Sequence, residues 1–66
     1  MSDDLTDAAG WFQDRGFDLS VTQDDETWWA TLIPVGDPAA AVARYGRGDT
    51  PEAAAVRARK RYEQEQ

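Results

Sequence analysis

The sequence predicts one α+β domain over residues 1–66, with the order α-β-β-β-α and two helices packed on one face of a three-stranded antiparallel sheet. Three observations predict this class: helical spacing of apolar residues near the start, alternation of apolar and polar residues from Phe17 to Gln23, and a well-signalled helix that follows Thr50. A chain of 66 residues buries only a thin core, so we expect its seven aromatic residues to supply much of that core.

The first element is predicted to be a helix. Its buried stripe consists of apolar residues at helical spacing, namely Leu5, Ala8, Ala9 and Phe12. Thr6, or Ser2 one turn earlier, is the expected N-cap residue. Gly16 is suited to the left-handed residue that follows a helix, with Phe17 packing back on the last turn.

Two strands are predicted next, over residues 17–23 and 27–33, joined by the polar turn Asp24-Asp25-Glu26 into an antiparallel hairpin. The second strand is apolar on both faces. One face carries Trp28, Ala30 and Leu32, and the other carries Trp29, Thr31 and Ile33. This pattern is typical of a central strand that helices cover on one side and something else contacts on the other.

Residues 39–45 allow two interpretations. Asp37 as N-cap, Pro38 at the first helical position and Gly46 after the alanine run favour a helix. A hairpin with one apolar face, however, needs a third strand to be stable. We therefore favour a strand.

The last helix is predicted from residue 51 to about residue 63, with Thr50 as its cap and Pro51 at its first position. Its small-residue face should lie close on the sheet, and it consists of Ala54, Ala55, Ala58 and Tyr62.

Composition excludes several classes of function. The chain has no cysteine and no histidine, which removes disulfides, Cys/His zinc sites and nucleophile–histidine pairs. Asp24-Asp25-Glu26 lacks the spaced ligands of a calcium loop. We therefore expect no catalytic residues, no metal, no cofactor and no small-molecule ligand.

The acidic start and the absence of a long apolar run predict a cytoplasmic protein that does not interact with membranes.

Charge is unevenly distributed along the chain. The net charge is −6; residues 1–37 hold nine acidic residues and one arginine, which gives −8, and residues 38–66 hold six basic and four acidic residues, which gives +2. The candidate nucleic-acid contacts in the basic half are Arg44, Arg47, Arg57, Lys60 and Arg61. Helical spacing spreads the basic residues of the last helix around its axis, so a solvated face is the simpler interpretation.

Trp29, Thr31 and Ile33 are the candidate interface residues, because an aromatic patch on an open sheet face suggests a contact surface. This hypothesis predicts that Trp29→Ala leaves the fold intact and abolishes self-association or partner binding. The alternative interpretation is that the first helix or the loops cover both adjacent tryptophan rings.

Three segments form a recognisable combination: a strand that ends in Ile33-Pro34, then Gly48-Asp49-Thr50, and then a helix that opens with Glu52, Ala54 and Ala58. Through these segments, residues 26–62 resemble the HicB-like antitoxin fold. The resemblance implies a small bacterial-type interaction domain, and one version of this function is the neutralisation of a protein partner, as in antitoxins. The usual glycine-rich opening before the second strand is replaced here by Asp24-Asp25-Glu26.

The α-β-β-β-α order also resembles the double-stranded RNA-binding domain, which shares the glycine turn before its last helix. The positions that hold phosphate-binding lysines in that family are Pro51, Glu52 and Ala55 here, and none is basic. We therefore expect no useful duplex RNA binding. The sequence predicts a non-enzymatic domain that binds a protein partner or self-associates, and the alternative is a nucleic-acid-binding accessory protein that uses the basic half.

Overall fold

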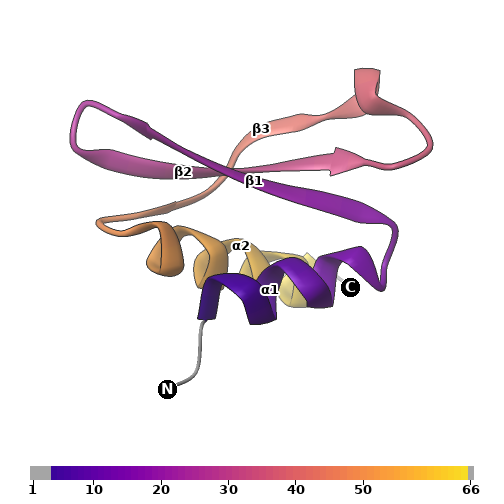
Figure 1. Cartoon of the computed structure of the whole chain (residues 1–66), viewed down its shortest axis with the longest axis horizontal. Helices are drawn as coiled ribbons and strands as arrows, with labels where there is room; N and C mark the ends of the chain where they lie inside the picture. The colour runs from indigo at the N-terminus through magenta and orange to yellow at the C-terminus, as the bar shows by residue number, and fades with distance from the viewer. Residues whose placement is uncertain (1–3, 66) are drawn as a thin grey trace.

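The computed structural model describes residues 4–65. Its elements are α1 (Asp4–Gln13), β1 (Phe17–Asp24), β2 (Thr27–Pro34), the short 3₁₀ turn η1 (Pro38–Ala40), β3 (Val42–Gly48) and α2 (Pro51–Glu65). The sheet is antiparallel with the order β1-β2-β3. Both helices lie on the same side of this sheet and leave its other face open (Figure 1). The predicted fold class is confirmed.

The hairpin of β1 and β2 forms as predicted, and each strand is one residue longer than expected. Its register runs without interruption from Phe17 opposite Pro34 to Asp24 opposite Thr27. The two turn residues both have positive φ, 53° at Asp25 and 68° at Glu26. These angles are those of a type I′ turn, whose twist matches that of the flanking strands.

α1 begins at Asp4, so Thr6 lies inside the helix and the prediction that it caps the helix is wrong. Of the predicted buried stripe, Ala8 and Phe12 are buried, whereas Leu5 and Ala9 remain partly exposed. The alternative cap, Ser2, lies outside the described residues. Gly16 has a φ of 86°, so its predicted left-handed conformation is confirmed.

Both interpretations of residues 39–45 are partly right. Pro38 opens a single 3₁₀ turn, although the side chain of Asp37 makes no capping hydrogen bond. The strand begins only at Val42, which lies opposite Leu32, and it continues to Gly48. Gly46 is therefore a strand residue, as the favoured interpretation implies, and not the end of a helix, as the alternative interpretation would have it. The third strand forms because it completes the sheet and packs against α2.

α2 packs closely on β3 through its small residues, as predicted. Ala54, Ala55 and Ala58 are buried. The contact leaves no space for a side chain at Gly46, where an added Cβ would lie 2.6 Å from the carbonyl oxygen of Ala54. The predicted cap is also confirmed, because the backbone N–H of Ala53 donates to Oγ1 of Thr50 at 3.0 Å.

Aromatic rings fill the space between the helices and the start of β1. Phe12 is fully buried, and its ring centroid lies 5.0 Å from that of Trp11 and 5.6 Å from that of Tyr62, both edge-to-face. The guanidinium groups of Arg15 and Arg59 stack over the Trp11 ring at 3.6 Å and 4.9 Å. The chain has few leucine and isoleucine residues, and these packed aromatic rings supply apolar area in their place. Between residues 4 and 65, neither helix combines the length and the hydropathy needed to cross a bilayer.

Candidate protein-interaction surface

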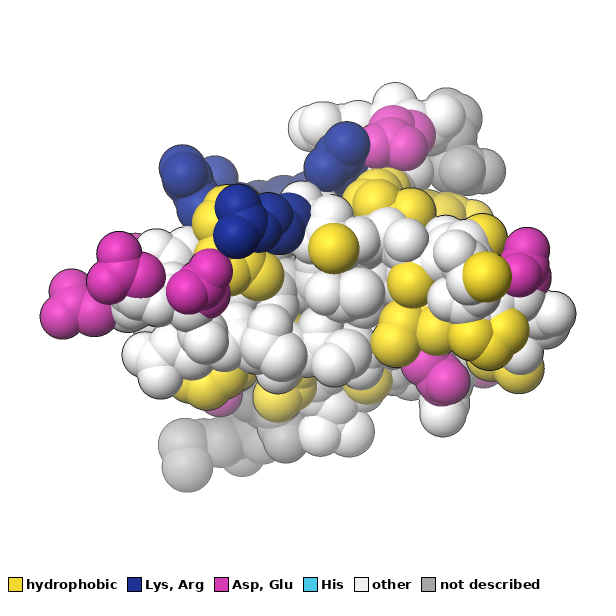
Figure 2. Space-filling view, turned by 90° about the horizontal axis from the view of Figure 1, so that it is seen from above, with side chains coloured by type: hydrophobic (Ala, Val, Ile, Leu, Met, Phe, Trp, Pro, Cys, Tyr) yellow, Lys and Arg dark blue, Asp and Glu magenta, His cyan; other side chains and the backbone are white. Residues whose placement is uncertain are grey.

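The open face of the sheet carries the predicted interface residues. The adjacent tryptophans point in opposite directions, because side chains alternate along a strand. Trp28 packs against the core under the sheet, whereas Trp29, Thr31 and Ile33 lie on the open face and are each partly exposed. Figure 2 looks onto this face, where uncharged side chains occupy the centre and basic side chains gather along one margin.

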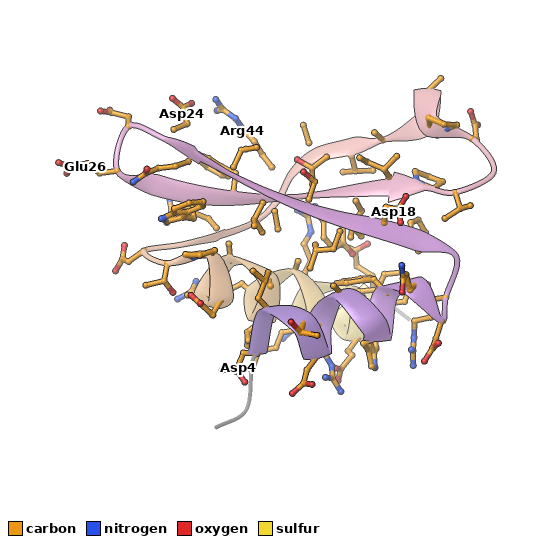
Figure 3. All side chains as sticks on the ribbon, in the orientation of Figure 1. Asp4, Asp18, Asp24, Glu26 and Arg44 are labelled. Atoms are coloured by element: carbon orange, nitrogen blue, oxygen red, sulfur yellow. The ribbon has the colours of Figure 1, made fainter. Side chains whose placement is uncertain are left out.

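Trp29 is accompanied by an arginine from β3. Arg44 has a left-handed φ of 57°, at the irregularity where the β2–β3 register shifts. Its guanidinium lies 4.8 Å from the centroid of the Trp29 ring, and its Nη2 is 3.3 Å from Oδ2 of Asp24. Figure 3 shows Arg44 and Asp24 pointing toward one another above the sheet. Arg44 thus crosses the open face from β3 to the end of β1.

The contacts of Arg44 are weak enough to be exchanged for contacts with a partner. The side chains of Arg44 and Asp24 are 65% and 64% exposed, and ion pairs of this kind contribute at most about 1 kcal/mol. Sequence reasoning placed Arg44 among the nucleic-acid candidates and missed its position over Trp29. No sequence signal marks a non-glycine residue with positive φ, so this arrangement could not be foreseen.

The five candidate nucleic-acid residues lie in separate surroundings. Arg44 lies on the open face, and Arg47 and Arg57 border an open hollow of about 350 Å³ beside the first turn of α2. Lys60 borders a different hollow, between the helices, together with Asp4, Asp7 and Glu63. Arg47 also lies opposite Trp29 in the β2–β3 register, so it shares the open face with Arg44. The structure therefore groups these two arginines but does not bring all five residues together on one surface.

Arg61, the last of these candidates, makes contacts with Glu65 and Tyr45 of the same chain. Its Nε donates to Oε1 of Glu65 at 2.8 Å, and its Nη1 donates to the carbonyl oxygen of Tyr45 at 3.1 Å. The guanidinium also stacks 4.5 Å from the centroid of the Tyr45 ring. Arg61 thus links the end of α2 to β3.

Tyr45 is a core residue that sequence reasoning missed. It is 7% exposed and belongs to the same cluster as Phe12 and Leu32. Burial raises the pKa of its hydroxyl, and the charge of Glu65 and a hydrogen bond with it raise this pKa further. Because Tyr45 follows the strand irregularity at Arg44, simple alternation along β3 does not give the face on which it lies.

The acidic turn does not form a cation site in the part of the chain that the structure describes. No group of three or more acidic residues between residues 4 and 65 is arranged to hold a metal ion. Glu26 instead projects from the tip of the hairpin (Figure 3). Over the same range, every buried polar side-chain atom has a hydrogen-bond partner.

Comparisons of the chain with protein-family models, with curated proteins and with solved structures return no match. The chain has a small α-β-β-β-α fold with a three-stranded antiparallel sheet, two helices on one face, and an aromatic residue of the central strand on the other.

Proposed function

We propose that this chain is a non-enzymatic protein-interaction domain that binds a protein partner, or a second copy of itself, through the open face of its sheet. The observation that carries the proposal is the position of Trp29, Thr31 and Ile33 on the uncovered side of the central strand. Partly exposed aromatic and β-branched residues on a rigid strand are typical of contact surfaces.

The neighbours of Trp29 support this assignment. Tryptophan and arginine are enriched among the residues that contribute most to protein–protein binding. Here Arg44 stacks beside Trp29, and Arg47 lies directly opposite it in the β2–β3 register. A partner that covers Trp29 would therefore also contact two cationic side chains, and these favour a carboxylate-bearing partner surface at that margin.

The resemblance of residues 26–62 to HicB-like antitoxins supports one specific form of the proposal, in which the domain neutralises a protein partner. The segments that carry this resemblance lie at strand ends: Ile33-Pro34 ends β2, and Gly48-Asp49-Thr50 connects the end of β3 to α2.

Nucleic-acid binding by the basic half receives less support. Affinity of that kind depends on several cations that contact neighbouring phosphates. Lys60 lies beside acidic residues, Arg59 pairs with Glu63 at 3.1 Å, and Arg61 pairs with Glu65.

Two adjacent substitutions test the proposal. Trp29→Ala removes an open-face ring, and Trp28→Ala removes a ring that packs against the core. We expect Trp29→Ala to unfold at the same temperature as the wild type. If the chain binds itself, the variant should no longer associate with increasing concentration in sedimentation velocity. If it binds another protein, the tagged variant should no longer retain the protein that the tagged wild type retains in a nuclease-treated pull-down. Trp28→Ala, in contrast, should lower the unfolding temperature.

Two outcomes would contradict the proposal. One is association that Trp29→Ala leaves unchanged. The other is retention of nucleic acid alone, with a steep loss of affinity as salt is added, which would favour the basic half as the functional surface.

A further inference from the structure

β1 is a regular edge strand with one unpaired side. Among the described residues its only strand neighbour is β2, because the sheet order is β1-β2-β3. The strand is eight residues long, and its pairing with β2 has no irregularity from Phe17 to Asp24. It contains no proline and no lysine, which are two of the residue types that commonly protect an exposed edge from pairing.

The outward main-chain groups of β1 can be assigned from its pairing with β2. The N–H of Val35 donates to the carbonyl oxygen of Gly16 at 3.0 Å, which makes these two residues a hydrogen-bonded pair one step before the strand begins. Hydrogen-bonded and non-hydrogen-bonded pairs alternate along an antiparallel ladder. The residues of β1 whose N–H and C=O groups face away from β2 are therefore Phe17, Leu19, Val21 and Gln23.

The other edge of the sheet differs in this respect. β3 has a register shift between its partners Ala30 and Leu32, and Arg44 at that position has a positive φ. Such an irregularity twists an edge and interrupts its hydrogen-bonding row. An extended segment added to this sheet would thus pair better with β1 than with β3.

Apolar surface lies directly beneath the β1 edge. Phe17, Leu19 and Val21 point toward the helices and pack against the core, yet each remains partly exposed because no strand lies beyond them. In strand addition, main-chain hydrogen bonds supply affinity, and contacts with alternate side chains supply specificity. Both components are present along this edge.

Charge determines which occupant suits the edge. Residues 4–26, which comprise α1, β1 and the hairpin turn, carry seven carboxylates and one arginine. Two copies paired through β1 would bring two such surfaces together, and the repulsion would oppose that dimer. A cationic segment would be attracted instead, and exposed Asp18 on β1 is one of the carboxylates positioned to pair with it.

We propose that the β1 edge binds an extended, lysine- or arginine-bearing segment of a partner protein, which adds to the sheet as a fourth strand. This surface is distinct from the open face around Trp29. The two surfaces can therefore be tested separately.

The test uses the full chain and a short synthetic peptide in which valine and threonine alternate between two terminal lysines. A matched peptide carries glutamates in place of the lysines. Amide hydrogen exchange, followed by NMR with and without peptide, reports which main-chain groups become paired. We expect the lysine peptide to slow exchange at Leu19, Val21 and Gln23, whose amides face outward, and to leave Ser20 and Thr22 unchanged. The glutamate peptide should have no effect.

Two charge reversals complete the test at low salt. Asp18→Lys should weaken binding of the lysine peptide by about fivefold, which corresponds to the loss of one exposed ion pair. Asp37→Lys makes the same change in net charge in the exposed segment between β2 and η1, and it should leave the affinity within about twofold of the wild type. Trp29→Ala should also leave peptide binding unchanged, so the failure of either proposal can be recognised without the other.

Three results would overturn the proposal. The first is equal binding of both peptides, or of neither. The second is peptide-induced protection confined to β3 or α2. The third is protection of Leu19 and Val21 that grows with protein concentration in the absence of peptide, which would assign the edge to a second copy of the chain.

Discussion

Glu26 occupies a position at which the backbone favours glycine. It is the second residue of the type I′ turn and has a φ of 68°. A left-handed conformation costs an L-residue about 1–2 kcal/mol relative to glycine. We therefore expect Glu26→Gly to raise the free energy of unfolding by about 1 kcal/mol, measured as a higher midpoint in urea. Glu26→Ala keeps the steric cost of a side chain and should leave the midpoint nearly unchanged. A gain of the same size in both variants would attribute the effect to lost charge rather than to backbone geometry.

Gly46 shows the opposite requirement, because glycine is needed there for space. A Cβ at this residue would lie 2.6 Å from the carbonyl oxygen of Ala54 and 2.9 Å from Cα of Ala58. Both neighbours are helix backbone, which cannot turn aside as a side chain can. We expect Gly46→Ala to lower the free energy of unfolding by about 3 kcal/mol. This loss is a large fraction of the stability of a small domain, so the unfolding temperature in thermal denaturation should fall markedly.

Gly10 provides the matched control. An added Cβ at Gly10 meets nothing within 4 Å, and the residue lies within α1. Gly10→Ala should therefore stabilise the domain by up to about 1 kcal/mol, through helix propensity alone. Equal effects of the two substitutions would show that α2 does not constrain Gly46.

At the scale of elements, α2 depends on its N-cap. Oγ1 of Thr50 accepts the backbone N–H of Ala53 at 3.0 Å, which satisfies one of the unpaired donors of the first turn. Thr50→Ala should lower the free energy of unfolding by about 1 kcal/mol, and Thr50→Ser should restore most of it, because serine keeps the acceptor. The measurement is chemical denaturation followed by far-UV circular dichroism. Loss of stability in both variants would indicate that the threonine methyl group, rather than the hydroxyl, makes the contribution.

Local sequence signals predicted most elements because those signals coincide with the final packing. The alternation of apolar and polar residues predicted β1, and the cap residue Thr50 followed by Pro51 predicted the start of α2. The segment from Pro38 to Gly48 was harder, since its local helix signals act over a single 3₁₀ turn only. Beyond that turn, pairing with β2 and the contact between Gly46 and α2 override the helix propensity of the alanine run.

The candidate surface was predictable to the same extent. Because side chains alternate along a strand, the sequence alone predicts that Trp28 and Trp29 lie on different faces of β2. Two features were not predictable: the stacking of Arg44 on the Trp29 ring, and the burial of Tyr45, the residue that follows Arg44. Both depend on one irregularity in β3 that arises from tertiary packing and leaves no pattern in the sequence.

For the molecule as a whole, Tyr45 connects the sheet with the end of the last helix. It is buried on β3, and Glu65 and Arg61 of α2 lie at its hydroxyl and its ring. Because burial and Glu65 raise its pKa above the ordinary value of 10.0, the folded protein keeps this proton at a pH where the unfolded chain has lost it. The folded state then binds more protons than the unfolded state, so the free energy of unfolding must fall as pH rises above about 10.

This linkage predicts the alkaline behaviour of the domain. The stabilisation associated with the protonated Tyr45 is fully present below pH 10.0 and is lost as pH rises through the higher pKa of the folded state. Tyr45→Phe removes the titrating hydroxyl, so its free energy of unfolding should decline less steeply than that of the wild type as pH rises above 10.0. Other groups that lose protons in this range are present in both proteins, and the difference between their slopes isolates Tyr45. Urea denaturation at a series of pH values measures both slopes. Parallel curves would mean that Tyr45 ionises as readily in the fold as in the unfolded chain, and that Glu65 and burial do not act on it as the structure indicates.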